Sequence, residues 1–438
     1  MLPVVCADCQ TLLSLSVLLY SNNIPPQNQI FICLSPASLN AGQGIKFLCH
    51  VSDTLKGRCS DTNVEELIKL LPEGYQQACY ETKAIERKRT VQTPEELLVM
   101  CLYYIYGASL LETSQLAKMN GTGKISDVAF MKRFAKSSRW FQWITKNIKP
   151  GDMCHYQKPG ILQEYNVTAI DASDVYTKGA VKQAWHLHYA LDLFSLNCQQ
   201  YKITDEKTGE TLKNFEIRKK DLIIAGRAYA TITGMEYCLE NGGDFILRIR
   251  NKAFNLYNAE REQVFLTDWL KTLDGDASCA MFYYRDSQKN YKNVRICALP
   301  KTEEEIKKEE KRLKKKESKK QIKISDDTKF SHRYMFVATS LPETFTAEDI
   351  LSIYRLRWQV EMVFKRYKSI LGAGSVPVKT KEATEAWING KMMLALLIEK
   401  FIGSVDFSPS GKSRKKQEHM ERNQTGISVN FYSGHSKN

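Results

Sequence analysis

The amino-acid sequence predicts an α/β protein whose mixed sheet follows a helical N-terminal region and is interrupted by a mostly β insertion. Three observations carry this prediction. Helical patterns fill residues 65–134, and short β-type runs begin near Tyr165 and later alternate with helices. The strongest helical pattern comes near the end, at 346–371. Strands that first follow one another and then alternate with helices are typical of a sheet with mixed strand directions.

The composition is that of a globular protein with surplus positive charge. Of the 438 residues, 43% are hydrophobic and 26% are charged, which excludes a disordered or fibrous chain. Lys and Arg number 63 against 49 Asp and Glu, a formal charge of +14. Because Lys and Arg bind phosphates with release of counterions, this surplus favours nucleic acid over a membrane as partner. The sequence contains no run of 18 apolar residues, so we expect no transmembrane helix.

The 12 cysteines are scattered and too few for a disulfide scaffold. We therefore expect them to be reduced, as in a cytoplasmic protein. Cys6 and Cys9 form one CxxC pair, but no second pair follows at zinc-finger spacing. A structural metal at this pair is therefore the less favoured interpretation.

Residues 1–60 differ from the rest of the chain. The first 45 residues contain no Lys or Arg, where uniform composition would place about six or seven. We interpret 1–60 as an atypical extension, either disordered or added upstream of the true domain. Residues 61–160 are expected to form a helical region. Thr93 before Pro94 marks one helix start, and helices at 109–118 and 125–134 would allow a helix-turn-helix.

Residues 161–250 are expected to hold the first part of the sheet core. Three strands in succession, a meander, precede an alternation of helices and strands. The expected strands are Val167–Ile170, Trp185–Phe194, Gln200–Ile203, Leu222–Ala225 and Asp244–Arg250, and the expected helices are Glu210–Phe215 and Ala230–Glu240.

The second half of the chain is expected to return to the core after the insertion. Residues 251–345 form the insertion, with β-like segments and a highly charged helix at Glu303–Lys323. Residues 346–405 hold two core helices, Thr346–Leu371 and Glu382–Ile402. Residues 406–438 are polar and basic, which predicts a disordered tail.

One face of the 346–371 helix gathers four side chains that suit phosphodiester chemistry. Tyr354, Arg357, Glu361 and Lys368 are spaced by 3, 4 and 7 residues, which places them along one side of a helix. A carboxylate can bind a hard cation, while the basic and phenolic groups hold phosphate oxygens. The alternative from the pattern alone is an amphipathic helix with surface ion pairs.

The spacing Y-x2-R-x3-E-x6-K, in the context YRLRWQVEMVFKRYKSILG, resembles the Y-R-E-K signature of insertion-sequence transposases of the DDE class. The segments FVATSLPETFTAEDIL and GKMMLALLIEK strengthen the resemblance, which covers about residues 67–409. It implies a ribonuclease H-like core with a mostly β insertion before the helix that carries the Glu. It also implies that two Asp and this Glu bind divalent metal ions, with Mg2+ expected and Mn2+ as its substitute.

The resemblance assigns two of the three metal-binding positions to carboxylates and the third to a glycine. Asp171 follows the apolar run Val167–Ile170 and matches the first Asp, expected at the end of the first core strand, with Asp174 as the fallback. An Asp that caps a turn is the alternative. The second Asp is expected in a run resembling ADRAY, where this chain reads AGRAY with Gly226. Asp221 cannot easily take this role, because it lies roughly 16 Å earlier along the strand and its side chain is on the opposite face.

The glycine predicts weak catalysis. Two-metal phosphoryl transfer uses a shared carboxylate between ions about 3.5–4 Å apart. Losing a ligand worth several kcal/mol slows cleavage by orders of magnitude, because ~1.4 kcal/mol is tenfold in rate. We therefore expect Asp171 and Glu361 to remain as metal ligands and DNA cleavage to be poor or absent. One alternative is a catalytically inactive DNA-binding remnant or repressor; another is an unrelated nuclease with a replacement acid near Gly226.

The resemblance also implies the partners. Double-stranded DNA, both the terminal repeats of an element and its target, would be bound by a homodimer in a synaptic complex, at the nucleoid in the cytoplasm of a bacterium. Tyr354, Arg357 and Lys368 would position phosphates, and Arg227 would do so beside the second-Asp position.

Further DNA contacts are expected in the helical N-terminal region. Lys132 and Arg133 offer positive charge at helical spacing, which suits phosphates or a groove. Trp140 and Trp143 are interpreted as core rather than as a base-stacking platform. His186 and His188 face one side of a predicted strand without a third ligand, which favours a structural role. The mixed charges of 303–320 indicate a solvated helix rather than a DNA-binding stripe.

Overall fold

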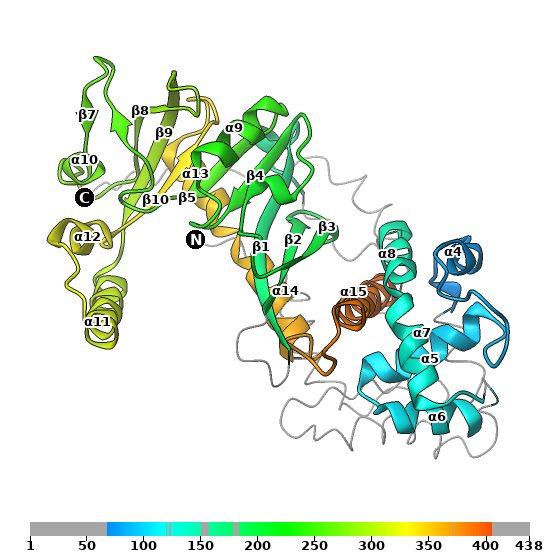
Figure 1. Ribbon diagram of the computed structural model, residues 1–438. Coiled ribbons are helices and arrows are strands. Elements are labelled where there is room, and N and C mark those ends of the chain that lie inside the picture. Colours follow the sequence, from blue (N-terminus) through cyan, green and yellow to red (C-terminus); the bar gives the residue numbers. More distant parts are fainter. Residues whose placement is uncertain are drawn as a thin grey trace, which may run out of the picture.

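The computed structural model describes residues 68–119, 121, 124–149, 157–177, 184–369 and 371–404. The atypical extension 1–60, the Cys6–Cys9 pair and the basic tail 406–438 lie outside these residues. So do Asn120, Thr122 and Gly123 of the expected helix-turn-helix. The described residues cover the sheet, the insertion and the helices that bear the candidate site (Figure 1).

The core sheet has the expected mixed strand directions. β2 pairs antiparallel with β1 and with β3, which confirms the meander, while β4 pairs parallel with both β1 and β5. The strands are β1 (Asn166–Thr177), β2 (Ala184–Asp192), β3 (Cys198–Asp205), β4 (Asp221–Ala225) and β5 (Asp244–Arg248).

Alternating side chains give this sheet two apolar faces. In β1, Ala169 packs into one buried cluster and Ile170 into the other, and Ile224 and Ile223 repeat the alternation in β4. Helix α9 (Ile232–Glu240) covers the Ile170 face, and the C-terminal helices cover the Ala169 face. A sheet buried on both sides is a rigid support for polar groups at the ends of its strands.

The insertion extends the same sheet rather than forming a separate one. β10 pairs antiparallel with β5, and the sheet continues from it in the order β9-β8-β6-β7. The elements of this region are β6 (Leu256–Tyr257), β7 (Gln263–Val264), α10 (Leu266–Leu270), β8 (Ser278–Arg285), β9 (Tyr291–Pro300), α11 (Glu303–Lys320), α12 (Asp326–Ser331) and β10 (Tyr334–Thr339).

Two expectations about local structure are wrong. Cys279 and Cys297 are not reduced but form a disulfide, because the register of β8 and β9 places them directly opposite each other. The helix expected at Glu210–Phe215 is a single 3₁₀ turn, η2 (Leu212–Asn214). Thr211 begins this turn in an extended conformation and accepts a bond from the backbone of Lys213.

The helix expected at Thr346–Leu371 is two helices, α13 (Ala347–Arg355) and α14 (Trp358–Ser369). The amides of Leu356 and Arg357 donate to the carbonyls of the residues three positions earlier instead of four, at 3.0 Å each. This tighter 3₁₀-type turn redirects the chain. No Pro or Gly marks the break, so periodicity alone could not reveal it.

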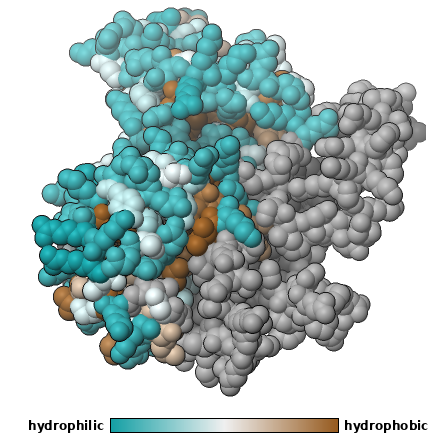
Figure 2. Space-filling model, turned by 90° about the vertical axis from the view of Figure 1, so that its right-hand side faces the viewer, coloured by the Kyte–Doolittle hydropathy of each residue, from teal (hydrophilic) through white to brown (hydrophobic). Residues whose placement is uncertain are grey.

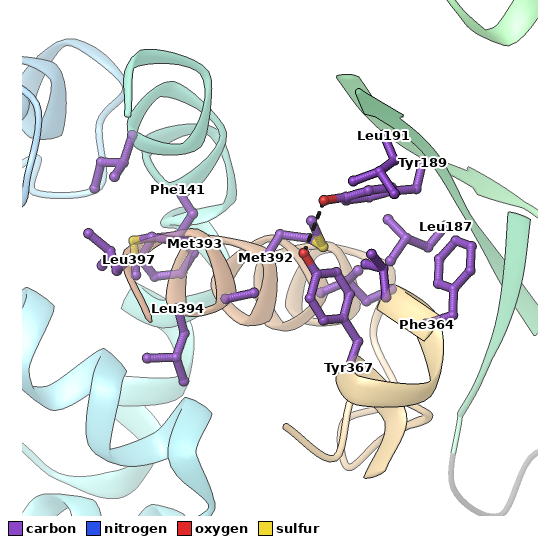
Figure 3. Close-up of a cluster of buried hydrophobic side chains, with 14 of the residues drawn as sticks. Phe141, Leu187, Tyr189, Leu191, Phe364, Tyr367, Met392, Met393, Leu394 and Leu397 are labelled. Carbon is purple, nitrogen blue, oxygen red and sulfur yellow. Dashed lines mark hydrogen bonds between the residues drawn. The ribbon is translucent and has the colours of Figure 1, made fainter. Parts of the chain in front are cut away.

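Helix α15 (Lys381–Ser404) joins the sheet core to the N-terminal helices (Figure 1). Its Met393 and Leu397 lie beside Phe141, whereas Met392 lies toward Tyr189 and Tyr367 (Figure 3). The N-terminal helices are α4 (Tyr75–Glu81), α5 (Pro94–Tyr106), α6 (Leu110–Met119), α7 (Asp127–Lys136) and α8 (Ser138–Asn147), and the one remaining helical turn and strand are η1 (Gly160–Leu162) and β11 (Ser375–Val376).

Local signals explain where several of these helices begin and how closely they pack. Thr93 forms the expected N-cap of α5, with a capping box completed by Glu96. At the α15–α5 contact, a Cβ on Gly390 would lie 2.4 Å from Cδ1 of Ile105. Glycine is therefore needed there to let the two helices approach.

The described helices contain none that is long and apolar enough to cross a membrane. The face of the molecule in Figure 2 is largely hydrophilic where residues are described, with a hydrophobic band near its centre.

Candidate active site

Strand β1 positions Asp171 beside the end of β4. The parallel pairing of the two strands ends at Ile170 and Ala225, so Asp171 and Gly226 are the next residues on neighbouring strands. Asp171 was expected at the end of its strand, but β1 continues to Thr177 by pairing with β2. Asp171 therefore lies on a rigid strand rather than in a turn.

Arg357 brings Asp171 and Glu361 together. Its Nη1 lies 3.2 Å from Oδ2 of Asp171, and its Nη2 contacts Oε1 of Glu361 one helical turn further along. Its Nε donates to the hydroxyl of Tyr354 at 3.2 Å. The turn between α13 and α14 carries Arg357 and so aims the guanidinium at β1. Two carboxylates far apart in sequence thus share one cation.

The electrostatics of the two carboxylates differ. Burial raises the pKa of the Asp171 carboxyl above its ordinary value, and the positive charge of Arg357 only partly offsets this. The side chain of Asp171 is 23% exposed and that of Glu361 is 54% exposed. Glu361 is therefore the more accessible of the two to a ligand from solution.

Gly226 leaves an open position beside this pair. A Cβ built on Gly226 would meet no heavy atom within 4 Å, and its φ is not among the positive values. Neither close packing nor a left-handed backbone therefore requires glycine there. There is therefore room for the first atom of a side chain at this position, beside Asp171.

Other acids near Asp171 do not complete a metal site. Asp174 binds Nδ1 of His186 at 2.8 Å and accepts a bond from the hydroxyl of Tyr176. Burial raises the pKa of Glu210, and the charges of Asp171 and Asp174 raise it further. Within the described ranges, no three His, Cys, Asp or Glu side chains are grouped closely enough to hold a metal ion.

Sequence reasoning missed Glu210, because it follows Thr208-Gly209 in a loop outside every motif. Only its electrostatic coupling to Asp171 in the fold singles it out. The histidine pair is structural in its contacts, as expected. Nε2 of His188 lies 2.9 Å from the hydroxyl oxygen of Thr204, and burial lowers the pKa of His188 to about 4.

The other predicted phosphate-binding residues lie at different distances from Asp171 and Glu361. Tyr354 is 4% exposed, so its hydroxyl serves Arg357 rather than solvent. Lys368 is exposed on α14, two turns or about 10 Å beyond Glu361 along the helix. Arg227 follows Gly226 and is half-buried. Tyr354 and Arg357 therefore belong to the carboxylate pair, while Lys368 and Arg227 flank it.

The structure does not bring Lys132 and Arg133 to this site. Both are on α7, which packs against α6, α8 and α15. Lys132 is exposed, whereas Arg133 donates to the backbone carbonyl of Arg87 at 3.2 Å. Trp140 is fully buried and its indole donates to the Tyr75 carbonyl, which confirms its interpretation as core.

Comparisons with known proteins agree with this architecture. A family model described as a transposase DDE domain matches residues 162–398, from the start of the sheet core into α15. Two Escherichia coli relatives, protein InsL of insertion sequence element IS186A (strain K12) and the transposase of IS421, are each 25% identical over 79% of this chain and 95% of their own length. The transposase of IS231C from Bacillus thuringiensis subsp. berliner is 32% identical over 25% of this chain and 23% of its own. The chain belongs to the insertion-sequence transposases with a DDE domain and has the α/β core, consistent with a ribonuclease H-like fold, expected of them.

Proposed function

We propose that this transposase binds the DNA ends of an insertion sequence but cleaves and joins strands poorly, because Gly226 replaces the second catalytic Asp. The observation that carries the proposal is the position of Gly226. It lies beside Asp171 on the neighbouring strand, and Asp171 and Glu361 share the guanidinium of Arg357. Two of the three expected carboxylates are therefore together, with open space where the third would stand.

The residues present suit one divalent ion better than two. Asp171 and Glu361 offer the carboxylate oxygens that Mg2+ prefers, and Mn2+ would take the same ligands. In the family reaction such ions activate the attacking oxygen and stabilise the leaving oxygen. With glycine at 226, no carboxylate is available to bridge a second ion. The single positive charge of Arg357 already compensates part of the negative charge of these two carboxylates, which weakens their attraction for a metal ion.

The chain's own residues retain the means to hold a phosphodiester. Arg357 is fixed by Tyr354 and keeps its donors beside the carboxylates, where a phosphate oxygen would be bound. Lys368 would contact the backbone two helical turns away, and Arg227 would contact it on the β4 side. Such contacts fix the position of DNA without reading its sequence.

Transposases act on DNA, and the partners proposed here are the double-stranded terminal repeats and the target. End recognition would fall to the N-terminal helices, with exposed Lys132 and neighbouring Arg133 as phosphate contacts. A homodimer would hold two ends in a synaptic complex. We expect this work to take place at the nucleoid in the bacterial cytoplasm.

A second candidate function is a catalytically inactive remnant or repressor that occupies element ends. The vacant carboxylate position at Gly226 favours it, because DNA contacts do not depend on that side chain. The two candidates differ in residual chemistry: an impaired enzyme still nicks DNA slowly in Mg2+ or Mn2+, whereas a repressor binds without nicking.

The direct test is a cleavage assay on duplexes that carry the DNA flanking this gene, with Mg2+ or Mn2+ added. We expect stable binding and slow or undetectable strand cleavage. Brisk cleavage by the unaltered chain would contradict the proposal. A chain that neither binds nor cleaves these ends would contradict both candidates.

A further inference from the structure

Four cations gather near the ends of β4 and β5, on the side of the candidate site that faces the insertion. Arg227 follows β4 directly, and Arg248 is the last residue of β5. Because Ala225 pairs with Leu247, Arg248 is the lateral neighbour of Gly226, as Asp171 is on the other side. The position of the missing carboxylate thus lies between an acid and a cation.

The insertion adds two more cations beyond these strand ends. β10 passes Arg248 at Val337 and continues pairing with β9 as far as Tyr334, three residues or about 10 Å further. Lys301 follows β9, and α11 begins at Glu303 and carries Arg312. In Figure 1, α11 projects from the end of β9, apart from α14 and α15. The insertion therefore places Lys301 and Arg312 on the β5 side of these strand ends.

One carboxylate serves this group. Glu309 lies 2.9 Å from Nη2 of Arg312 and 3.6 Å from Nζ of Lys301. His332 lies 3.4 Å from Glu309 but adds little charge at neutral pH, because burial and the charge of Arg227 lower its pKa. Four permanent cations therefore face a single acid, and the group has a net positive charge.

Arg227 shows the electrostatic cost of this arrangement. Its Nε is buried and has no hydrogen-bond partner among the described residues. Burial and then the charges of Arg248 and Arg312 lower the pKa of Arg227 to about 10. An unpaired guanidinium in a repulsive field is stabilised when an anion binds, and a phosphate accepts such donors in a bidentate geometry.

We propose that Arg227, Arg248, Lys301 and Arg312, here named the insertion-side cation group, bind consecutive backbone phosphates of the DNA whose reacting phosphate lies at Asp171 and Glu361. This inference rests on the proposed DNA-binding function and adds a role for the insertion. The charged helix α11 is then more than a solvated helix, because its Arg312 side contacts DNA. From β1 to β9 the sheet spans four strand spacings, about 19 Å, which matches five or six base-pair rises of duplex.

The test is the salt dependence of binding to a short fluorescein-labelled duplex, measured by anisotropy. Arg312→Gln and Arg248→Gln should each weaken binding several-fold and reduce the slope of log K against log salt by about one. Lys311→Gln is the matched control, because Lys311 is exposed about 100° around α11 from Arg312 and about 200° from the buried Leu313, and should leave the slope nearly unchanged. Glu309→Gln removes the internal counter-charge and should tighten binding.

Thermal melting of each variant shows whether it is folded, and Arg248→Met, which removes the charge but keeps an unbranched side chain, replaces Arg248→Gln if that variant does not fold. Slopes for Arg312→Gln and the Arg248 variants no different from that of Lys311→Gln would overturn this inference alone. A wild-type chain that does not bind the duplex would overturn the DNA-binding function as well.

Discussion

The two sides of Gly226 differ in how their charges are compensated. On the β1 side, Asp171 and Glu361 share the single positive charge of Arg357, which Tyr354 holds in place. On the β5 side, the described residues offer the insertion-side cation group only Glu309 as a paired counter-charge. The first arrangement is stable without a ligand, whereas the second gains stability when an anion binds. The proposed function expects this difference, because the cations that would hold DNA are present while glycine stands at one position that would hold metal.

The largest expected effect comes from restoring the missing carboxylate. Gly226→Asp should raise the rate of DNA cleavage in Mn2+ by about a hundredfold or more, since a few kcal/mol of transition-state stabilisation corresponds to that factor. The open space at Gly226 means that the variant should fold normally. The measurement is strand cleavage on the flanking DNA ends.

Gly226→Asn is the matched control, because it adds almost the same volume without the charge. It should leave cleavage near the wild-type level. Equal rates for the Asp and Asn variants would show that the position does not supply a metal ligand.

Removing the shared cation tests the compensated side. Arg357→Gln leaves Asp171 and Glu361 close together without a positive charge, so the free energy of unfolding should fall by about 1–3 kcal/mol. Urea denaturation measures this loss. Adding Asp171→Asn to Arg357→Gln should recover part of it, because the repulsion is then removed. If the two substitutions are simply additive, the two side chains are not coupled as the contacts indicate.

Glu399, which is remote from Gly226, shows how burial changes the pKa of a carboxyl that has no full ion pair. Burial raises the pKa of Glu399 on α15 to about 7, with the charge of Arg366 and a bond from Tyr367 opposing the shift. A raised folded-state pKa stabilises the fold below the ordinary glutamate pKa, and this stabilisation is lost as pH rises through about 7. The melting temperature should therefore fall by a few degrees between acid and mildly alkaline pH.

Glu399→Gln should remove most of this pH dependence, which differential scanning calorimetry would show. A wild-type melting temperature that rises over the same pH range would mean that the carboxylate is stabilised in its charged form instead.

The smallest expected effect concerns the N-terminal helices. Lys132→Gln should reduce the salt slope of DNA binding by about one, if Lys132 contacts a phosphate. Lys136 on the same helix is paired with Glu86 at 2.9 Å, so Lys136→Gln should reduce the slope less. Equal effects of the two variants would indicate that α7 contributes only general charge.

The sequence was sufficient to predict the sheet core, because apolar runs and helix starts are local signals. The meander, β4, α9 and the capping box at Thr93 are found where periodicity and residue type predicted them. The break at Leu356–Arg357 and the disulfide Cys279–Cys297 were not predicted. Both depend on tertiary contacts or on strand register, for which no single segment carries a signal.

The candidate site was predictable in its members and not in its arrangement. The spacing of Tyr354, Arg357 and Glu361 singled out these residues as candidates. The tight turn that directs Arg357 toward Asp171 on β1 was not predicted, because one continuous helix was expected there. The insertion-side cation group could not be predicted from the sequence, because Arg248 and Arg312 are 64 residues apart in the chain. The pairing of β10 with β5 and β9 brings them near each other. Glu210 was missed because it lies in a loop outside every motif, and only the fold couples its charge to that of Asp171.

The central claim is that Asp171 and Glu361 form an incomplete metal site beside Gly226. Calorimetric titration with Mn2+ of the unaltered chain and of Gly226→Asp tests it most directly. We predict weak binding of at most one ion by the unaltered chain, lost in Asp171→Asn, and markedly tighter binding by Gly226→Asp. Two ions bound by the unaltered chain as tightly as by Gly226→Asp would contradict the claim.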